Sequence, residues 1–370
     1  MILLPNATRG KARGAPAGGL SRRSKMLDLG YRSFGWKGTV LVIDTPATIR
    51  LSLGSAVVLG LRKARMEASP TTLYAMLGDT CLGACRFCAQ ARDSNADPKF
   101  LSRVAWPEFD FDDVLGRLKG ATDVRRICVQ TLHEAGLEPR LVAAAKALHE
   151  AAGLPLSVCM NPTDPEWLPR LKAAGVDRVG VGLDCATEET FRQIKPGFHW
   201  DRYHSFLDAI VEVFGTGSVH LIVGLGDSDE DLVRMMQAAR DRRCTVALFA
   251  FTPVRGARLD LPAPDVGRYR ALQLARYLIV SGRARVEAMA FENGRLTALH
   301  IDPAIIERAL HSGLPFRTSG CPDCNRPLYN ERPGGVMYNY AAPPSEPELA
   351  LARQELAQYL ALPMGARAQG

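Results

Sequence analysis

The sequence predicts an α/β fold in which parallel strands close into a complete (β/α)8 barrel. From Thr71 onward, short apolar runs of strand-forming residues alternate with longer amphipathic segments of helical period. Such alternation is typical of parallel strands joined by right-handed crossovers. Eight apolar runs occur between residues 71 and 320, the number of strands that a closed barrel of this type contains.

The predicted elements follow one another in this order. The expected strands are Thr72–Leu77, Arg126–Thr131, Leu156–Met160, Arg178–Leu183, Val219–Gly224, Val246–Phe251, Arg285–Ala290 and Phe316–Ser319. The expected helices between them include Glu138–Ala152, Trp167–Ala174, Asp201–Phe214, Glu230–Arg240 and Val266–Ser281. In such a barrel the chemistry lies on the loops that follow the strands.

Two extensions are expected before the barrel. Residues 1–38 hold eight Lys and Arg against one acid, Asp28, which accounts for the whole net charge of +7. We expect this basic segment to be disordered. This segment attracts an acidic partner or nucleic acid, or it is a solvated leader with no role. A third alternative is that Met26 is the true start. Residues 39–70 form an N-terminal extension, in which Ser52–Arg62 reads as an apolar helix that closes the bottom of the barrel.

After the barrel, residues 321–370 form a C-terminal extension. Residues 322–345 are rich in Pro, Gly, Asn and Tyr and are expected to be irregular, whereas residues 346–361 read as an amphipathic helix. The chain has no apolar run of the ~18 residues that a membrane span needs, and no signal-peptide pattern. We therefore expect a cytoplasmic protein, in which the nine cysteines are metal ligands or redox groups rather than disulfides.

One cysteine motif stands out because of its spacing and its place. Cys81, Cys85 and Cys88 have the spacing Cys-x3-Cys-x2-Cys, directly after the first predicted strand, with Phe87 before the last thiol. Three thiolates can hold three corners of an iron–sulfur cubane and leave one iron for another ligand. The motif resembles the signature of the radical S-adenosylmethionine (SAM) superfamily, which implies a [4Fe-4S] cluster and SAM as cofactors. The alternative is a zinc site or unrelated cysteines, although structural zinc usually takes four ligands.

Several other residues resemble the SAM-binding positions of the biotin synthase branch of that superfamily. Asp184 ends the fourth predicted strand and would contact ribose, although a helix N-cap is equally compatible with its position. Lys195 is a candidate partner of the methionine carboxylate, or else a surface lysine. By the same resemblance, Gly224, Gly226 and Gly256 would lie along adenosine, although glycines after strands often only form turns.

The remaining cysteines suggest a second site. Cys128 and Cys159 lie on the second and third predicted strands, where biotin synthases carry auxiliary-cluster cysteines, but Ser218 stands where their third such cysteine would be. Cys321 and Cys324 start where the eighth predicted strand ends, at the expected catalytic rim, and could complete an auxiliary [4Fe-4S] cluster. The alternatives are a zinc knuckle or disulfide for that pair, and small buried hydrophobes for the other two.

The remaining two cysteines and one serine have simpler expectations. Cys185 and Cys244 are expected to be structural. The Arg317-Thr-Ser319 stretch is similar to the C-terminal Arg-Ser-Ser of single-chain lipoyl synthases, whose serine binds the auxiliary cluster, so Ser319 is a further candidate ligand.

The segments Thr71-Thr-Leu-Tyr74 and Ser319–Gly335 resemble biotin-synthase-like proteins that act as two-component lipoyl synthases. The resemblance implies sulfur insertion into an octanoyl chain on a lipoyl carrier protein, with a second radical SAM protein and an electron donor such as ferredoxin or flavodoxin. One alternative is a biotin synthase-like or methylornithine synthase-like enzyme that acts on a small molecule. The other is an RNA-binding or RNA-modifying protein with a C-terminal zinc knuckle, although we do not expect a nucleic-acid partner.

Overall fold

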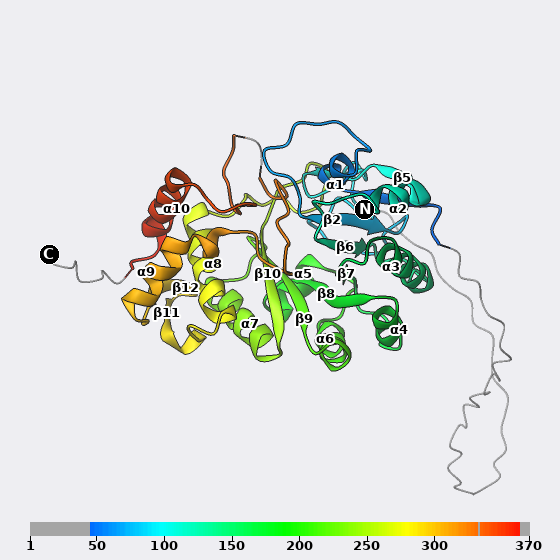
Figure 1. Cartoon of the computed structure of the whole chain (residues 1–370). Helices are drawn as coiled ribbons and strands as arrows, with labels where there is room; N and C mark the ends of the chain where they lie inside the picture. Colours follow the sequence, from blue (N-terminus) through cyan, green and yellow to red (C-terminus); the bar gives the residue numbers. More distant parts are fainter. Residues whose placement is uncertain (1–44, 332–333, 363–370) are drawn as a thin grey trace, which may run out of the picture. The chain divides into compact units, whose positions relative to one another are not determined.

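The computed structural model describes residues 45–331 and 334–362 and is organised around an eight-stranded sheet (Figure 1). Six neighbouring strands of this sheet are parallel and coincide closely with the first six predicted strands. They are β2 (Thr72–Leu77), β6 (Arg126–Thr131), β7 (Leu156–Cys159), β8 (Val176–Asp184), β9 (Gly217–Val223) and β10 (Cys244–Ala250). The α/β class and the parallel order of the first six strands are thus as the sequence predicts.

Helices follow the strands and pack on the outer face of the sheet (Figure 1). They are α2 (Phe111–Leu118), α3 (Glu138–Ala152), α4 (Trp167–Ala173), α5 (Glu188–Ile194), α6 (Trp200–Phe214), α7 (Asp229–Asp241) and α8 (Val266–Val280). Strand residues alternate between the two faces. In β2, Leu73, Ala75 and Leu77 belong to the main core, whereas Tyr74 and Met76 belong to a smaller inner cluster with Trp106. The inner face is therefore left for the site.

The described residues do not close the sheet into the predicted eight-stranded barrel. The seventh predicted strand, Arg285–Ala290, is instead a 3-10 turn (η1, Val286–Ala288) followed by β11 (Met289–Glu292). β11 pairs antiparallel with β12 (Arg295–Leu299) in a separate sheet. Asn293 and Gly294 join them with φ values of 51° and 78°, as expected for the tight turn that Asn-Gly favours. Because Met289 and Ala290 pair within this hairpin, the predicted seventh strand does not join the large sheet.

The eighth predicted strand is also absent from the sheet. Residues 314–316 form a 3-10 turn, η2 (Leu314–Phe316), and Arg317 makes only an isolated bridge with Tyr340. Side chains instead cover the free edge of β10. The backbone N–H of Leu248 donates to Ser319 Oγ (2.8 Å), the Tyr269 hydroxyl donates to Leu248 O (3.1 Å) and Asn330 Nδ2 donates to Ala250 O (2.9 Å).

The N-terminal extension adds strands to the opposite edge of the sheet. β1 (Thr48–Leu51) pairs antiparallel with both β2 and β5 (Glu108–Asp110). The predicted helix over Ser52–Arg62 is the shorter α1 (Leu53–Val58), capped by Ser52. Strand β1 was not predicted, and closure of the barrel's bottom by α1 stays a prediction. A small hairpin, β3 (Phe100–Leu101) and β4 (Val104–Ala105), follows the cysteine loop. The predicted basic tail, residues 1–38, lies outside the described residues.

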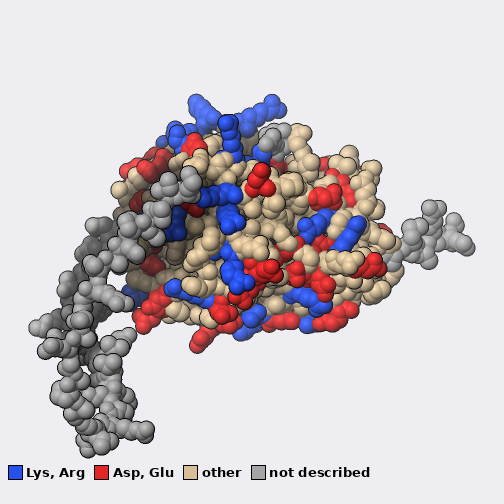
Figure 2. Space-filling model, turned by 180° about the vertical axis from the view of Figure 1, so that it is seen from behind, with Lys and Arg blue, Asp and Glu red and all other residues tan. Residues whose placement is uncertain are grey.

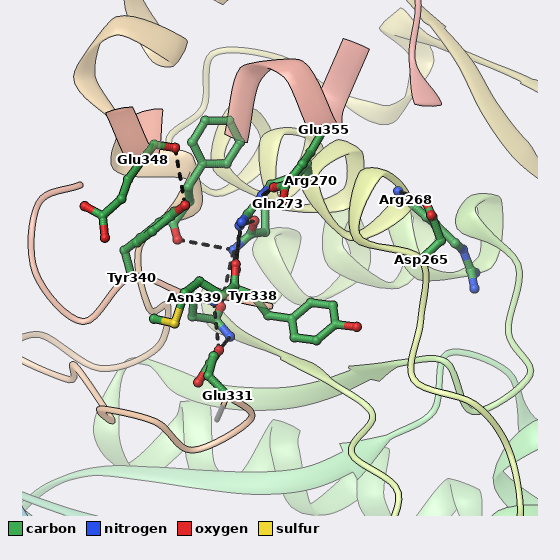
Figure 3. Close-up of polar contacts among 12 residues, drawn as sticks. Asp265, Arg268, Arg270, Gln273, Glu331, Tyr338, Asn339, Tyr340, Glu348 and Glu355 are labelled. Carbon is green, nitrogen blue, oxygen red and sulfur yellow. Dashed lines mark hydrogen bonds and ion pairs between the residues drawn. The ribbon is translucent and has the colours of Figure 1, made fainter. Parts of the chain in front are cut away.

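A buried polar network fastens the C-terminal segment to α8 (Figure 3). The Arg270 guanidinium, fully buried, donates to Glu355 (2.8 Å) on α10 (Glu346–Tyr359), to Gln273 (2.9 Å) and to the carbonyl of Tyr338 (2.7 Å). Asn339 donates from its backbone to Glu331 (2.8 Å). α10 lies where the last helix was predicted, and α9 (Pro303–Ser312) precedes the segment. Of the described helices, none is long and apolar enough to cross a membrane.

Candidate active site

The loop after β2 places the clustered cysteines on the wall of one cavity. Cys81, Cys85 and Cys88 line this first cavity, of about 200 Å³, at the carboxyl ends of the parallel strands. All three are free thiols. Phe87 also lines the cavity and packs against the main core. Three free thiols on one wall fit a cluster held by cysteine sulfur.

Backbone N–H groups point at two of these sulfurs. Gly83 donates to Cys81 Sγ and Gln90 donates to Cys88 Sγ, each over 3.4 Å. Hydrogen bonds to the sulfurs help to set the reduction potential of a cluster. Burial raises the pKa of Cys88 to about 12 and also raises the pKa of Cys85. Both groups are therefore neutral thiols at pH 7 until a metal's positive charge displaces their protons.

Strand β1 helps to hold the cysteine loop. Arg50 donates to Gly78 O (2.8 Å) and to Gln90 Oε1 (3.2 Å). Gln90 in turn donates to the carbonyls of Pro98 (2.6 Å) and Phe100 (2.7 Å). The two ends of the loop are thus tied to the unpredicted strand β1 and to the β3–β4 hairpin.

Asp184 ends β8 in a conformation that few residues other than glycine adopt. Its φ is 70°, and the β8–β9 pairing has a bulge between Gly182 and Asp184. Bulges next to functional sites re-aim side chains, and here the carboxylate lines the first cavity with the thiols. The N-cap of α5 is Thr187, whose hydroxyl accepts from the Thr190 N–H, so the helix-capping alternative for Asp184 is wrong.

Lys195 lies just after α5 and points inward, so the surface-lysine alternative is wrong. It is 2% exposed, and its ammonium donates to Asp184 Oδ2 (2.8 Å) and to the Gly182 carbonyl. Burial lowers the pKa of Lys195, but Asp184, Tyr203 and Cys85 together outweigh this effect, and the net pKa is well above its usual value. Three aromatic rings surround the ammonium at 4.5 to 5.4 Å from their centroids: Tyr203, Phe191 and Phe198.

The three predicted adenosine-binding glycines are not among the described residues that line the first cavity. Gly224, Gly226 and Gly256 all have positive φ, at 107°, 125° and 91°, which explains why glycine stands there. At Gly256 an added Cβ would lie 2.6 Å from the backbone of Asn95 and Ala96. The chain's own loop therefore makes the close approach at Gly256, and adenosine binding by these glycines stays a prediction.

A second group of thiols lies on the inner face of the sheet. Cys128, Cys321 and Cys324 line a second cavity of about 60 Å³, whereas Cys159 lines the first. Burial raises the pKa of Cys128 well above its usual value, and Cys321 and Cys324 raise it further. The structure therefore brings three of the four candidate ligands of the auxiliary cluster to the second cavity, and places the fourth, Cys159, in the adjacent first cavity. Cys185 and Cys244 are buried in the core, as expected of structural cysteines.

The position of the Cys321–Cys324 turn corrects the expectation that it lies on the catalytic rim. The hydroxyls of Thr71 and Thr72, at the start of β2, donate to Asp323 O over 2.7 and 2.9 Å. The turn thus lies toward the amino ends of the strands. Without an eighth strand to carry it to the rim, the chain instead packs against the inner face of the sheet. Ser319 is engaged with the edge of β10, and is not among the residues that line the second cavity.

Polar groups around the second cavity suit an anionic group. The Arg326 guanidinium stacks 3.8 Å from the centroid of Phe249 and lines the cavity. Ser218 Oγ is buried there without a hydrogen-bond partner among the described residues. The Tyr74 hydroxyl lies 3.5 Å from Cys324 Sγ. A cation and an unpaired hydroxyl beside three thiols fit a thiolate-bound cluster, whose net charge is negative.

Four residues that the sequence analysis missed connect the two cavities. Gln130, His220, Phe249 and Tyr329 line both. Burial lowers the pKa of His220 to about 3, so its imidazole is neutral, and Nδ1 lies 3.6 Å from Cys159 Sγ. The sequence could have predicted that Gln130 lines the site. Residues two apart on a strand share a face, and Cys128, two residues earlier, is a candidate ligand of the auxiliary cluster.

Over residues 45–331 and 334–362, no three His, Cys, Asp or Glu side chains converge as ligands of a single metal ion. In a cubane each thiolate takes a different iron, so the thiols of a cluster site need not converge on one point.

The chain is similar in sequence to several known proteins. The sequence model of the Radical SAM superfamily matches residues 76–239. A biotin synthase of Sulfurihydrogenibium sp. (strain YO3AOP1) is 26% identical over 184 residues, which cover 48% of this chain and 54% of that protein. A lipoyl synthase of Nocardia farcinica (strain IFM 10152) is 24% identical over 171 residues, which cover 46% and 47%. The chain thus spans about half the length of the curated relatives it matches.

Among solved structures, a methylornithine synthase matches with a TM-score of 0.48 and 13% identity, over 57% of this chain and 62% of that one.

Proposed function

We propose that this chain is an enzyme that inserts sulfur at unactivated carbons. The proposal is supported by the match of the Radical SAM superfamily model to residues 76–239 and by the sequence similarity to biotin synthases and a lipoyl synthase. The substrate we propose is an octanoyl chain attached to a lipoyl carrier protein. The observation that carries the proposal is the adjacency of two thiol-lined cavities on the inner face of one sheet, which share Gln130, His220, Phe249 and Tyr329.

The residues divide into two sets of ligands. Cys81, Cys85 and Cys88 would hold the first [4Fe-4S] cluster, and Cys128, Cys321 and Cys324 an auxiliary cluster, with Cys159 beside it. When bound, the first cluster and SAM would supply, with one electron from an external donor, the radical chemistry that activates a C–H bond of the acyl chain, and the auxiliary cluster would supply sulfur.

The chain's own side chains bind, orient and exclude water. The Lys195 ammonium, held by Asp184 at 2.8 Å, presents a buried cation on which the methionine carboxylate of SAM can be anchored. The remaining Asp184 oxygen is left for ribose hydroxyls. The four residues that the two cavities share carry no formal charge, because burial keeps the His220 imidazole neutral. Orientation of the reacting groups in such a site can supply a large part of a rate enhancement.

The partners we propose are an octanoylated carrier protein, a second radical SAM protein and an electron donor such as ferredoxin or flavodoxin. The second protein is included because the segments Thr71–Tyr74 and Ser319–Gly335 resemble two-component lipoyl synthases.

Anaerobic turnover tests the proposal. The reconstituted enzyme is incubated with SAM, a reductant and an octanoyl-lysine peptide, with and without a second radical SAM protein. We expect 5′-deoxyadenosine together with a peptide that has gained the mass of sulfur. Deoxyadenosine release without sulfur gain on any acyl substrate would contradict sulfur insertion and favour a small-molecule reaction.

A further inference from the structure

A third cavity opens beside the two that contain cysteines. It measures about 400 Å³ and lies between the loop after α1, the β3–β4 hairpin and residues 326–331. Most of its wall is apolar, formed by Leu53, Val57, Met66, Phe100, Trp106 and Leu328. Leu53 and Phe100 are 39% and 37% exposed, which marks the mouth of this cavity on the protein surface.

The inner end of the third cavity meets the other two. Tyr74, Gln130, Arg326 and Tyr329 line both the third and the second cavity. Gln130 and Tyr329 also line the first. A molecule that enters from the surface through the third cavity therefore arrives between the first thiol group and the second.

One polar group in the apolar wall lacks a partner. Trp106 is 1% exposed, and its indole N–H has no hydrogen-bond partner among the described residues. Buried tryptophan N–H groups usually find an acceptor, and an unmade bond of this kind is costly. An apolar cavity with one unpaired donor suits an apolar chain that carries one acceptor oxygen.

The mouth of the cavity lies at a basic end of the molecule. The loop after α1, blue at the top of Figure 1, carries the exposed residues Arg62, Lys63 and Arg65. Figure 2 shows a group of Lys and Arg side chains projecting from the same end. An acidic carrier domain that docks here would present its attached chain to the mouth.

We propose that the third cavity is an acyl channel. It binds the unbranched acyl chain of a carrier-bound substrate, with the acyl carbonyl oxygen accepting from Trp106 Nε1 and the chain end directed to Gln130 and Tyr329. The proposal deepens the proposed function and rests on it. It explains how a long chain attached to a protein can reach a site on the inner face of the sheet.

Binding of acyl peptides to the reconstituted enzyme, without SAM or reductant, tests the channel. We expect the Kd, measured by anaerobic calorimetry, to fall roughly fifteenfold from a hexanoyl-lysine to an octanoyl-lysine peptide, since each buried methylene contributes about fourfold. Ala64→Trp, at the mouth, should raise the octanoyl Kd at least tenfold. Ala173→Trp, on an exposed position of α4, is the matched control and should leave it unchanged.

A second variant tests the carbonyl contact. Trp106→Phe keeps the ring and removes the N–H donor, so it should weaken octanoyl-lysine binding about threefold to tenfold. It should not weaken binding of an N-octyl-lysine peptide, which has a methylene in place of the carbonyl. Equal loss for both peptides would overturn the assignment of Trp106 Nε1.

Affinity independent of chain length, or equal effects of Ala64→Trp and Ala173→Trp, would overturn the channel. These outcomes are distinct from failure of the proposed function. Acyl binding in the channel without sulfur gain on turnover would contradict sulfur insertion alone. Sulfur gain that Ala64→Trp does not slow would contradict the channel alone.

Discussion

The buried Lys195–Asp184 pair allows a quantitative test of the site's electrostatics. We expect Lys195→Met to destabilise the protein by about 4 kcal/mol at pH 7. Methionine has a similar length and packs well against aromatic rings, so the change removes the charge and leaves most of the packing. It also leaves the Asp184 carboxylate in a buried site without its cation.

The magnitude follows from the geometry. At 2.8 Å the gross attraction is about 6 kcal/mol with an effective dielectric constant of ~20, and much of it offsets the cost of burying two charges. Breaking such a pair typically costs about 3–5 kcal/mol. The orphaned carboxylate can instead take up a proton, which for a free aspartate costs about 4 kcal/mol at pH 7 and about 1.5 kcal/mol at pH 5. The unfolded chain stays ionised at both values, so the destabilisation should shrink as the pH falls.

Thermal unfolding of reduced, cluster-free protein at pH 7 and pH 5 is the assay. We expect Lys195→Met to lower the Tm by roughly 5–10 °C at pH 7 and by less at pH 5. Adding Asp184→Asn should recover most of the loss, because asparagine tolerates the positive φ of that position. Lys146→Met is the matched control, since Lys146 pairs with Glu150 at 3.8 Å on the surface and should lose less than about 1 kcal/mol. A pH-independent loss, or no recovery in the double variant, would refute the reasoning.

Three further predictions concern the thiols and the hairpin. Cys321→Ala should lower iron from about eight to about four per chain and abolish sulfur transfer while SAM cleavage continues; loss of the cleavage as well would contradict the ligand assignment. Burial raises the pKa of Cys88 to about 12, so the alkylation rate of this thiol in cluster-free protein should rise about tenfold per pH unit from pH 8 to pH 11. Mass spectrometry of the alkylated peptides measures this rate. A rate that reaches a plateau near pH 9 would contradict the burial of Cys88. Gly294→Ala should cost about 1–3 kcal/mol, because φ is 78° and the new Cβ would lie 2.8 Å from Ser228 Cβ. The same substitution at Gly116, in α2 with open space around it, should stabilise by about 0.5–1 kcal/mol, and unfolding of the two variants side by side checks the contrast.

Local patterns made the first six parallel strands predictable, and a local pattern also explains the failure at the seventh. The run over Arg285–Ala290 has a strand-like composition, but Asn293-Gly294 lies just beyond it and favours a hairpin with Arg295–Leu299. Giving that dipeptide its usual weight would have replaced the seventh barrel strand with β11 and β12. The prediction of an eighth strand was wrong for a different reason. Residues Phe316–Ser319 are held by side-chain contacts to α8 and β10, and a local sequence pattern does not predict such contacts.

The candidate site likewise has one part that the sequence predicts and one part that it does not. Cys81, Cys85 and Cys88 are close in sequence, so their spacing suffices to predict that they face one cavity. The depth of Cys321 and Cys324 depends on the path of a segment without regular structure, held by contacts to Thr71 and Thr72 about 250 residues earlier. Long-range contacts of this kind are not visible in a sequence pattern.

The covering of β10 has a consequence for solubility. An open sheet ends in a strand whose unpaired N–H and C=O groups invite pairing with the same edge of another molecule. Here Ser319, Tyr269 and Asn330 occupy those groups on Leu248 and Ala250, so the edge offers no continuous ladder to a second copy. The segment that brings two cysteines to the inner face of the sheet thereby also protects the sheet against edge-to-edge aggregation. Shortening the chain before residue 319 should therefore favour insoluble assemblies as well as the loss of the second thiol group.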